Sequence, residues 1–464
     1  MAQREVLATI FLILASALLI EAPSHHRFPK PGSHHSRSEN GKRWALLVAG
    51  SYGYSNYRHQ ADVCHAYQVL KKGGLKDENI IVFMFDDIAS NKQNPRKGVI
   101  INRPNGPNVY PGVPKDYTGA NVTVGNFFNV ILANRSGLTG GSGKVLDSGP
   151  DDHIFIYYSD HGAPGFIEMP DGLIFARDFA HILKKKYEAR SYAQMVIYME
   201  ACFGGSIFKG LLSDNWNIYA TTAANPEEQS YVCYCMKQGE YQDTCLGDHY
   251  SVSWIEDSER RNLSGETLEK QFKLVRNRTW DSHVMEYGNK SLAARSFLNA
   301  FMGAGHLDRS PFSPLDTLES ANVSSFPRAK SYRISQHEAE LYHHRQQYVR
   351  ARRGSKERSH AKQKLVAEIR IREETDLRMS QIADALFGSE MGSYNMGKTT
   401  GRPEGEALVD DWDCLENMLK AYQERCGKLN TYGLKYTRLL ANMCNAGVHV
   451  EQMASAAARV CAVG

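Results

Sequence analysis

Short apolar runs alternate with amphipathic segments between Arg43 and about Gly305. The apolar runs have the length and uninterrupted hydrophobicity of strands that are buried on both faces, as in parallel sheets. The segments between them repeat apolar residues at the spacing of a helix with one buried face. We expect strands at 44–49, 80–85, 154–158, 195–199 and 216–221, and helices at 60–72 and 176–186. Strands alternating with helices predict an α/β fold with a mostly parallel sheet.

The pattern changes after about Gly305. Residues 307–334 are rich in serine and proline and lack periodicity, which indicates a linker. Ser335 to Glu338 (SQHE) has the form of a capping box and predicts a helix that runs to about Arg353, and helical periodicity then continues to the end. We therefore divide this part of the chain into an α/β core, a linker with the start of a helix, and an all-helical region, at 42–322, 323–345 and 346–464.

The N-terminus predicts entry of the chain into the secretory pathway. Residues 6–20 (VLATIFLILASALLI) are too short an apolar run for a comfortable membrane span and fit a signal peptide over 1–22, with an uncleaved anchor as the alternative. Residues 23–41 are rich in histidine, serine and proline and read as a propeptide, in which we expect no metal. Six glycosylation sequons agree with this route, at Asn121, Asn134, Asn262, Asn277, Asn289 and Asn322.

Composition and charge narrow the function. The 464 residues are 42% hydrophobic and 23% charged, which excludes a disordered, collagen-like or coiled-coil protein. A net charge of +4 is too small to indicate nucleic acid binding, and no later stretch is apolar enough to predict a membrane span. Residues 328–378, however, carry 14 Lys and Arg against 7 Asp and Glu, whereas residues 42–327 carry 29 against 31. The basic segment could dock on the slightly acidic core.

The nine cysteines fall into three groups. Cys235 and Cys245 flank a polar loop and could form a disulfide. Two further disulfides are expected in the helical C-terminal region, with three pairings open among Cys414, Cys426, Cys444 and Cys461. Cys64, Cys202 and Cys233 remain, and an odd thiol in an oxidising compartment raises the question of a function.

Reactive groups follow two of the expected strands. The run 154–158 leads into Ser-Asp-His161-Gly162, and the run 195–199 leads into Glu-Ala-Cys202-Phe-Gly-Gly. The carboxyl ends of parallel strands form the ligand crevice of an open α/β sheet, so a thiol and an imidazole delivered there can cooperate in nucleophilic catalysis. The alternative is a buried structural cysteine and a histidine bonded within a turn. The matching placement of both groups, with glycine close behind each, favours catalysis.

Several longer stretches carry a family resemblance. They are NYRHQADVCHAYQ at 56–68, INRPNG at 101–106, VPKDYTG at 113–119, GSGKVLDSGPDDHIFIYYSDHG at 141–162, YMEAC at 198–202, LGDHYSVSW at 246–254 and LVDDWDCLENM at 408–418. With these blocks in the same order, the chain resembles the legumains, or asparaginyl endopeptidases, of the plant vacuolar processing enzyme type. The resemblance implies a caspase-like core and a helical, death-domain-like C-terminal prodomain that covers the active site of the zymogen.

The resemblance also implies roles for individual residues. Cys202 would be the nucleophile, His161 the general base and acid, and Asn56 the residue that orients the imidazole, with the backbone N–H groups of Gly162 and Cys202 as the oxyanion hole. The pocket for the substrate side chain would comprise Arg58, His59, Asp160, Glu200, Ser230 and Asp248. A carboxamide has both an acceptor and a donor, so a pocket with a cation and carboxylates suits asparagine. Aspartate would fit only when protonated, at acid pH.

Three regions associated in this family with the choice between hydrolysis and ligation have a ligase-like form. Tyr231 is followed by Val232, and Gly162 by Ala163 and Pro164, where hydrolytic members usually have glycine at 232 and 163. The loop between Cys235 and Cys245 is short and lacks a proline-rich insert. These features predict a peptide asparaginyl ligase, with a hydrolytic asparaginyl endopeptidase as the alternative. One departure counts against activity: the family usually reads EACESGS, and this chain reads EACFGGS.

The expected partners follow from the same resemblance. They are peptides and proteins with an exposed Asn or Asp, and the prodomain acting as autoinhibitor, with no cofactor. Acid would protonate the pocket carboxylates, weaken the prodomain lid and permit self-cleavage in the vacuole, with candidate sites at Asn40, Asp308, Asp316 and Asn322. The sequence leaves open whether the zymogen dimerises and whether a binding-only homologue has lost activity.

Overall fold

A six-stranded sheet forms the centre of the molecule, in the order β11-β8-β7-β3-β1-β2. The computed structural model describes residues 41–304, 333–388 and 402–462. The strands are β1 (Arg43–Ala49), β2 (Ile80–Phe83), β3 (His153–Ser159), β7 (Gln194–Glu200), β8 (Ile218–Thr222) and β11 (Met285–Gly288). All neighbours pair in parallel except β11, which runs antiparallel to β8 at one edge. The expected mostly parallel α/β sheet is therefore confirmed.

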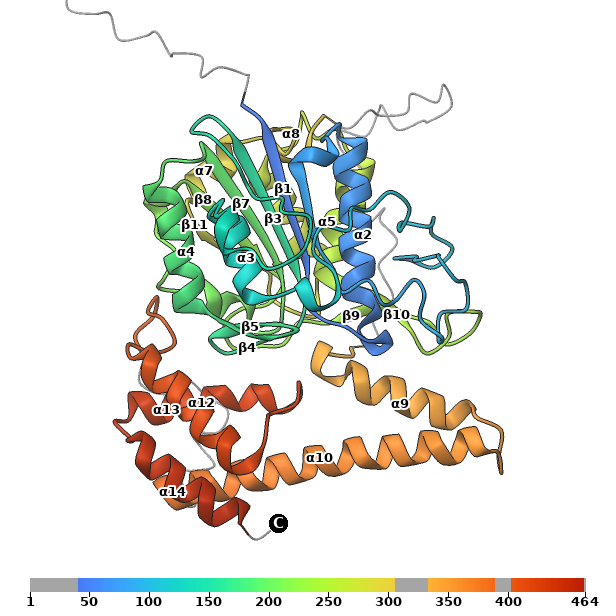
Figure 1. Ribbon diagram of the computed structural model, residues 1–464, viewed down its shortest axis with the longest axis vertical. Helices are drawn as coiled ribbons and strands as arrows, with labels where there is room; N and C mark the ends of the chain where they lie inside the picture. The colour runs from blue at the N-terminus through green and yellow to red at the C-terminus, as the bar shows by residue number, and fades with distance from the viewer. Residues whose placement is uncertain (1–40, 305–332, 389–401, 463–464) are drawn as a thin grey trace, which may run out of the picture. The chain divides into compact units, whose positions relative to one another are not determined.

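Alternate residues of each strand feed two separate cores. In β1, Leu46 and Val48 pack with α3 (Val124–Ile131) and α4 (Ala176–Glu188), whereas Ala45 and Leu47 pack toward the opposite layer. That layer contains α2 (Tyr57–Lys72), α5 (His249–Arg260), α6 (Leu268–Arg278), α7 (Lys290–Arg295) and α8 (Asn299–Met302). Because successive side chains of a strand point to opposite faces, uninterrupted apolar strands need helices on both sides, as Figure 1 shows.

Two small antiparallel units extend beyond the sheet. One consists of β4 (Gly162–Ala163), β5 (Phe166–Met169) and β6 (Gly172–Phe175), and the other of β9 (Val232–Cys235) and β10 (Cys245–Asp248). A disulfide joins Cys235 to Cys245 across the second unit, as its loop predicted. Both units lie where the parallel strands end (Figure 1).

The C-terminal region is helical, as expected. It contains α9 (Ala339–Arg350), α10 (Lys356–Phe387), α12 (Trp412–Cys426), α13 (Thr437–Asn445) and α14 (Val450–Cys461). Of the three pairings that the sequence left open, the structure has Cys414–Cys444 and Cys426–Cys461, which fasten α12 to α13 and α14. A Cβ added to Gly165 would lie 3.2 Å from Trp412 and 3.3 Å from Leu415, so this helical bundle packs against the turn between β4 and β5.

The predicted capping box at Ser335 is wrong. The Ser335 side chain caps no helix, and its backbone pairs with Tyr231 in an antiparallel bridge. A short 3-10 turn, η8 (Gln336–Glu338), follows, and the α-helix begins only at Ala339. Pairing with an edge strand has taken precedence over the local helix signal.

Some sequence expectations fall outside the described residues. These are the signal peptide, nearly all of the propeptide, and Asn40, Asp308, Asp316 and Asn322. Within the described ranges, no helix has the length and apolarity that crossing a membrane requires.

Candidate active site

Cys202 and His161 lie at the same edge of the sheet. Strands β3 and β7 are neighbours in parallel register, with Ser159 opposite Glu200, so the next residues of both strands emerge together. The contact is close enough that a Cβ added to Gly162 would lie 2.5 Å from the carbonyl oxygen of Cys202. Glycine is therefore required beside the imidazole for steric reasons, and the parallel register brings the two reactive groups together.

The His161 imidazole is held in one orientation. Its Nε2 lies 2.9 Å from Oδ1 of Asn56, whose own Nδ2 donates to the carbonyl of Tyr52 at 3.1 Å. Nδ1 is buried and has no hydrogen-bond partner among the described residues. Because the amide oxygen accepts the Nε2 proton, Nδ1 keeps the lone pair that a general base uses. Burial, with the nearby positive charges, holds the pKa of His161 well below its ordinary value.

The Cys202 thiol is covered and inactive in this state. Sγ accepts a hydrogen bond from the backbone N–H of Ser230 at 3.3 Å, and the residue is fully buried. Burial raises the pKa of the thiol to about 12, although the Ser230 hydrogen bonds and Arg58 oppose the shift. A neutral thiol beside a neutral imidazole is a latent pair, because the thiolate is the nucleophilic form.

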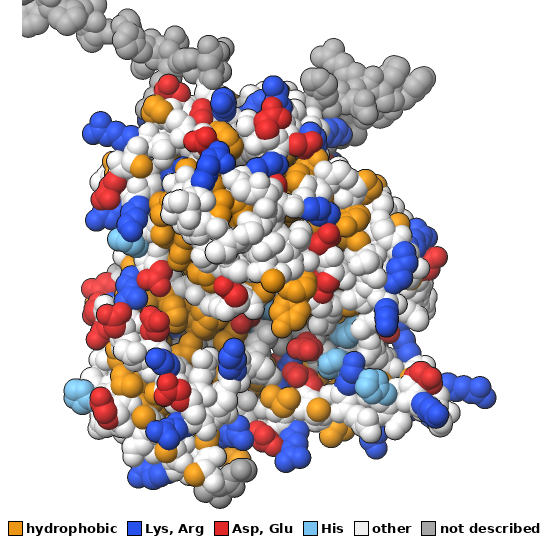
Figure 2. All heavy atoms as spheres, in the orientation of Figure 1, with side chains coloured by type: hydrophobic (Ala, Val, Ile, Leu, Met, Phe, Trp, Pro, Cys, Tyr) orange, Lys and Arg blue, Asp and Glu red, His pale blue; other side chains and the backbone are white. Residues whose placement is uncertain are grey.

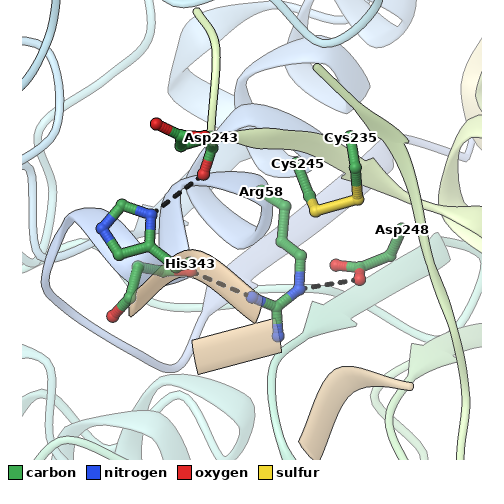
Figure 3. Close-up of a disulfide and its surroundings, with 7 residues drawn as sticks. Arg58, Cys235, Asp243, Cys245, Asp248 and His343 are labelled. Atoms are coloured by element: carbon green, nitrogen blue, oxygen red, sulfur yellow. Dashed lines mark hydrogen bonds and ion pairs between the residues drawn. A yellow bond between two sulfur atoms is a disulfide. The ribbon is translucent and has the colours of Figure 1, made fainter. Parts of the chain in front are cut away.

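A buried polar pocket adjoins Cys202. Arg58 and His59 come from the start of α2, Glu200 from the end of β7 and Asp248 from the end of β10. Arg58 Nε donates to Asp248 Oδ1 at 2.9 Å (Figure 3), and His59 Nδ1 lies 2.9 Å from Asp160 Oδ1. All six residues that the resemblance assigned to the pocket are at most 1% exposed. The pocket thus contains a fixed cation, carboxyl groups and a hydroxyl.

Gln336 fills this pocket. Its side-chain Nε2 donates to Glu200 Oε1 at 3.0 Å and to Ser230 Oγ at 2.9 Å. Its Oε1 lies 3.4 Å from Arg58 Nη2 and 3.3 Å from His59 Nε2. Donors therefore meet the carbonyl end of the carboxamide and acceptors meet the amino end, which is the arrangement the pocket was expected to offer an asparagine.

The backbone around Gln336 is bound as a short antiparallel strand. Gln336 N–H donates to the Ser230 carbonyl at 2.9 Å, and Val232 N–H donates to the Ile334 carbonyl at 3.0 Å. The segment that carries Gln336 thus adds an edge strand to the cleft, a common mode of peptide recognition. Sequence reasoning missed this residue, although a glutamine beside the expected lid was a chemical signal for a carboxamide pocket.

The residue after Gln336 is fixed as firmly. His337 is buried, and its Nε2–H donates to the Gly162 carbonyl at 3.0 Å. Arg372 of α10 donates to the His337 carbonyl at 3.0 Å and pairs with Glu338 and Glu368. The long helix therefore holds the segment in the cleft.

Two of the predicted ligase determinants, Tyr231 and Val232, contact this bound segment, and the other two follow Gly162, whose carbonyl binds His337. Tyr231 pairs with Ser335, and the fully buried Val232 packs near Cys235 and Ala339. Ala163 is also fully buried, and the Pro164 carbonyl accepts a hydrogen bond from Thr437 at 3.1 Å. These side chains border the cleft rather than the distant surface.

The loop between Cys235 and Cys245 contacts α9. The His343 side chain donates to the Asp243 carbonyl at 2.9 Å, beside the Cys235–Cys245 disulfide (Figure 3), and Arg350 pairs with the Asp243 carboxylate at 2.7 Å. Figure 2 shows basic side chains spread over the C-terminal helices with acidic ones among them. The expected docking of a basic segment is seen at contacts such as the ion pair of Arg350 with Asp243.

Acid protonation of the pocket carboxyl groups, expected from the sequence, stays a prediction. Burial raises the pKa of Glu200 to about 8 and that of Asp160 to about 7, so Glu200 is largely protonated at neutral pH and Asp160 still takes up a proton as the pH falls from 7 to 5. The groups that remain neutral until well below pH 6 are imidazoles. Burial lowers the pKa of His337 to about 4 and that of His59 to about 3.

Other predicted positions are placed as follows. Asn134, Asn262 and Asn277 are exposed, whereas Asn121 and Asn289 are partly buried. His59, Asp160 and His161 are close enough to share a cation, with ligand atoms within 4.8 Å of one another. The hydrogen bonds of His59 to Ser51 and of His161 to Asn56 already use these groups, so we assign no metal to them.

Comparison with known proteins adds two family matches and close relatives. Residues 43–304 match the peptidase C13 family, and residues 363–461 match the legumain prodomain. A vacuolar-processing enzyme of Vicia sativa is 50% identical over 433 residues, which cover 91% of this chain and 86% of the relative. The vacuolar-processing enzyme beta-isozyme of Arabidopsis thaliana is 44% identical over 472 residues, covering 97% and 94%. A crystal structure of caspase-1 from Spodoptera frugiperda has a TM-score of 0.34 at 10% identity, covering 61% of this chain and 99% of that one.

Proposed function

The chain belongs to the peptidase C13 family and is a legumain-type cysteine endopeptidase with its own prodomain as inhibitor; from this premise we propose that it cuts peptide chains after asparagine. The observation that carries the proposal is the carboxamide of Gln336 in the pocket beside Cys202. Asparagine has the same group on a side chain shorter by one methylene. Glutamine therefore fills the pocket of the latent enzyme, and a substrate asparagine takes its position after the lid leaves.

The reaction proceeds through a thioester. His161 takes the proton of the Cys202 thiol, and the sulfur attacks the backbone carbonyl carbon of the asparagine. The oxygen of that carbonyl becomes an oxyanion held by the backbone N–H groups of Gly162 and Cys202. Collapse of the oxyanion breaks the C–N bond, and the imidazolium gives its proton to the leaving amine. Water then attacks the thioester, His161 takes a proton from it, and the acid departs as the sulfur regains that proton.

Selectivity comes from the pocket's mixed polarity. Arg58 faces the carbonyl oxygen of the carboxamide, and Glu200 with Ser230 faces its amino group. An ionised aspartate would present an oxygen where an amino group is needed, so aspartate should be accepted only at acid pH, where it is protonated.

The names of the relatives support a processing role. They are called vacuolar-processing enzymes, and the secretory signal expected from the sequence agrees with that destination. We infer that this chain travels the secretory pathway to the vacuole and there matures proteins that expose an asparagine.

We also propose transpeptidation as a second activity of the same thioester. An amine that reaches the thioester before water gives a new peptide bond, so the outcome depends on the walls beside the leaving group. Ala163 adds a methyl group next to Gly162, whose carbonyl binds the residue after Gln336. Val232 adds a branched side chain where its backbone N–H binds the Ile334 carbonyl of the bound segment. Both features support ligation. The relatives' names support hydrolysis, and we therefore propose hydrolysis as the main activity.

One assay tests both activities. The activated enzyme is incubated at pH 5 and pH 7 with a peptide that has a free N-terminus and an internal asparagine, and the products are weighed by mass spectrometry. A linear acid supports the endopeptidase, and a cyclic product, which lacks the leaving peptide and has gained no water, supports transpeptidation. Intact peptide at both pH values would overturn the proposed function.

A further inference from the structure

Phe203 is a buried aromatic residue outside the hydrophobic cores. It directly follows Cys202 and is 6% exposed, yet it belongs to none of the four apolar clusters of the described residues. The resembled family usually has glutamate at this position. From the sequence alone Phe203 is a departure from the family pattern, because the role of a phenylalanine beside a nucleophile depends on what surrounds it.

The backbone fixes the direction of this side chain. Phe203 has φ 55°, in the left-handed region that non-glycine residues seldom adopt. Its N–H donates to the Glu228 carbonyl at 2.7 Å, and the next residue, Gly204, donates to the Ala201 carbonyl at 3.2 Å. These two hydrogen bonds hold the residue after the nucleophile in that conformation.

The ring of Phe203 lies next to His337, the residue that follows Gln336. The centroids of the Phe203 and His337 rings are 6.0 Å apart, and the two planes are tilted by 48°. His337 is also bonded to the Gly162 carbonyl and lies 6.4 Å, ring to ring, from the catalytic His161. Because Gln336 occupies the position of a substrate asparagine, His337 occupies that of the residue after the cleaved bond.

We propose that Phe203 is a specificity-determining residue, the aromatic wall of the subsite for the residue immediately after the cleaved asparagine. This inference rests on the proposed function and deepens it by naming the substrate class. Peptides with an aromatic or large aliphatic residue after asparagine are preferred, and those with aspartate or glycine there are disfavoured. In transpeptidation the same wall seats the first residue of the incoming amine.

The preference follows from the chemistry of the wall. When the lid leaves, the Phe203 ring meets water, and an apolar substrate residue buries it again. Aromatic pairs contribute beyond their buried area, which corresponds to a rate advantage of up to about tenfold. Glutamate at this position would instead attract a cationic residue and repel aspartate.

The test uses activated enzyme and one peptide series. The residue after asparagine is Phe, Leu, Lys, Asp or Gly, and kcat/KM is measured for each peptide with the native protein, Phe203→Glu and Phe203→Asn. Asparagine tolerates the left-handed backbone, so the Phe203→Asn variant can be measured even if Phe203→Glu fails to fold. Phe297→Glu is the matched control, because Phe297 is 43% exposed and pairs with Thr267, and the nearby Asn299 contacts Arg43 at the N-terminal end of β1.

The native enzyme should cleave the Phe and Leu peptides about tenfold faster than the Gly peptide. Both variants at 203 should reduce that ratio to about twofold, Phe203→Glu should favour Lys over Asp, and Phe297→Glu should leave the ratio unchanged. Equal rates across the series, or an unchanged ratio in both variants at 203, would overturn the inference while the proposed function stands. Cleavage of no peptide by the native enzyme would overturn the proposed function and this inference with it.

Discussion

Replacing Gln336 by leucine should open the zymogen. Leucine has a similar size but no polar atoms, so it removes the two hydrogen bonds to Glu200 and Ser230 and the two longer contacts to Arg58 and His59. A hydrogen bond contributes about 1 kcal/mol, and each buried group left without a partner costs about 1–3 kcal/mol. Water hydrates part of the pocket when the lid opens, so we expect the free energy that keeps the lid closed to fall by about 3 kcal/mol. This corresponds to about a 150-fold rise in the open fraction.

The open fraction can be measured without any catalysis. The rate at which iodoacetamide labels Cys202 in the uncleaved full-length chain reports how often the lid opens, and peptide mapping separates this thiol from the buried Cys64 and Cys233. Gln347→Leu on α9 is the control, because Gln347 bonds to His343 near the surface and not to the pocket. If Gln336→Leu is labelled no faster than the control, Gln336 does not hold the lid.

Three further changes test other parts of the account. Burial holds the pKa of His337 at about 4, so the zymogen is most stable above pH 6.5 and its free energy of unfolding falls by up to about 3 kcal/mol as the pH falls toward 4. In thermal unfolding of a Cys202→Ser zymogen, the His337→Gln variant should therefore lose less stability between pH 7 and pH 5 than the protein with His337. An equal loss would exclude His337 as the source of the pH dependence. Arg58→Lys keeps the charge but loses the planar fork, and kcat/KM for an asparagine peptide should fall about 100-fold, whereas a change below threefold would contradict the assigned role. Replacing Cys426 and Cys461 by serine should destabilise the C-terminal helices by about 3 kcal/mol in thermal unfolding, and an unchanged unfolding temperature would refute this.

The sheet and its reactive edge could be predicted because both depend on local pattern. Uninterrupted apolar runs specify strands covered on both faces, and parallel strands present their carboxyl ends at one edge. The sequence thus predicts that His161 and Cys202 reach the same edge, and the pairing of β3 with β7, which the structure shows, makes them neighbours there. The strand and helix ends were less exact: β2 ends at Phe83, and α2 begins at Tyr57 rather than at Gln60.

The plug in the pocket could not be predicted from local pattern. Ser335 and Glu338 fit a capping box, but the decisive partner of Ser335 is Tyr231, far away in the sequence. Burial also limits what the sequence predicts about charge. The sequence shows which residues are charged but not how deeply they are buried, and burial raises the pKa of Glu200 and lowers that of His337.

The pocket beside Cys202 is built to hydrogen-bond a carboxamide and so to place the bond after asparagine next to the thiol. It is tested most directly by kcat/KM of the activated enzyme on two peptides that differ only in having asparagine or its near-isostere leucine before the cleaved bond. A site built to hydrogen-bond a side chain rejects an analogue that lacks the polar group by about 10⁴-fold, and we expect a preference of that order for asparagine. Cleavage after leucine within tenfold of cleavage after asparagine would contradict the account.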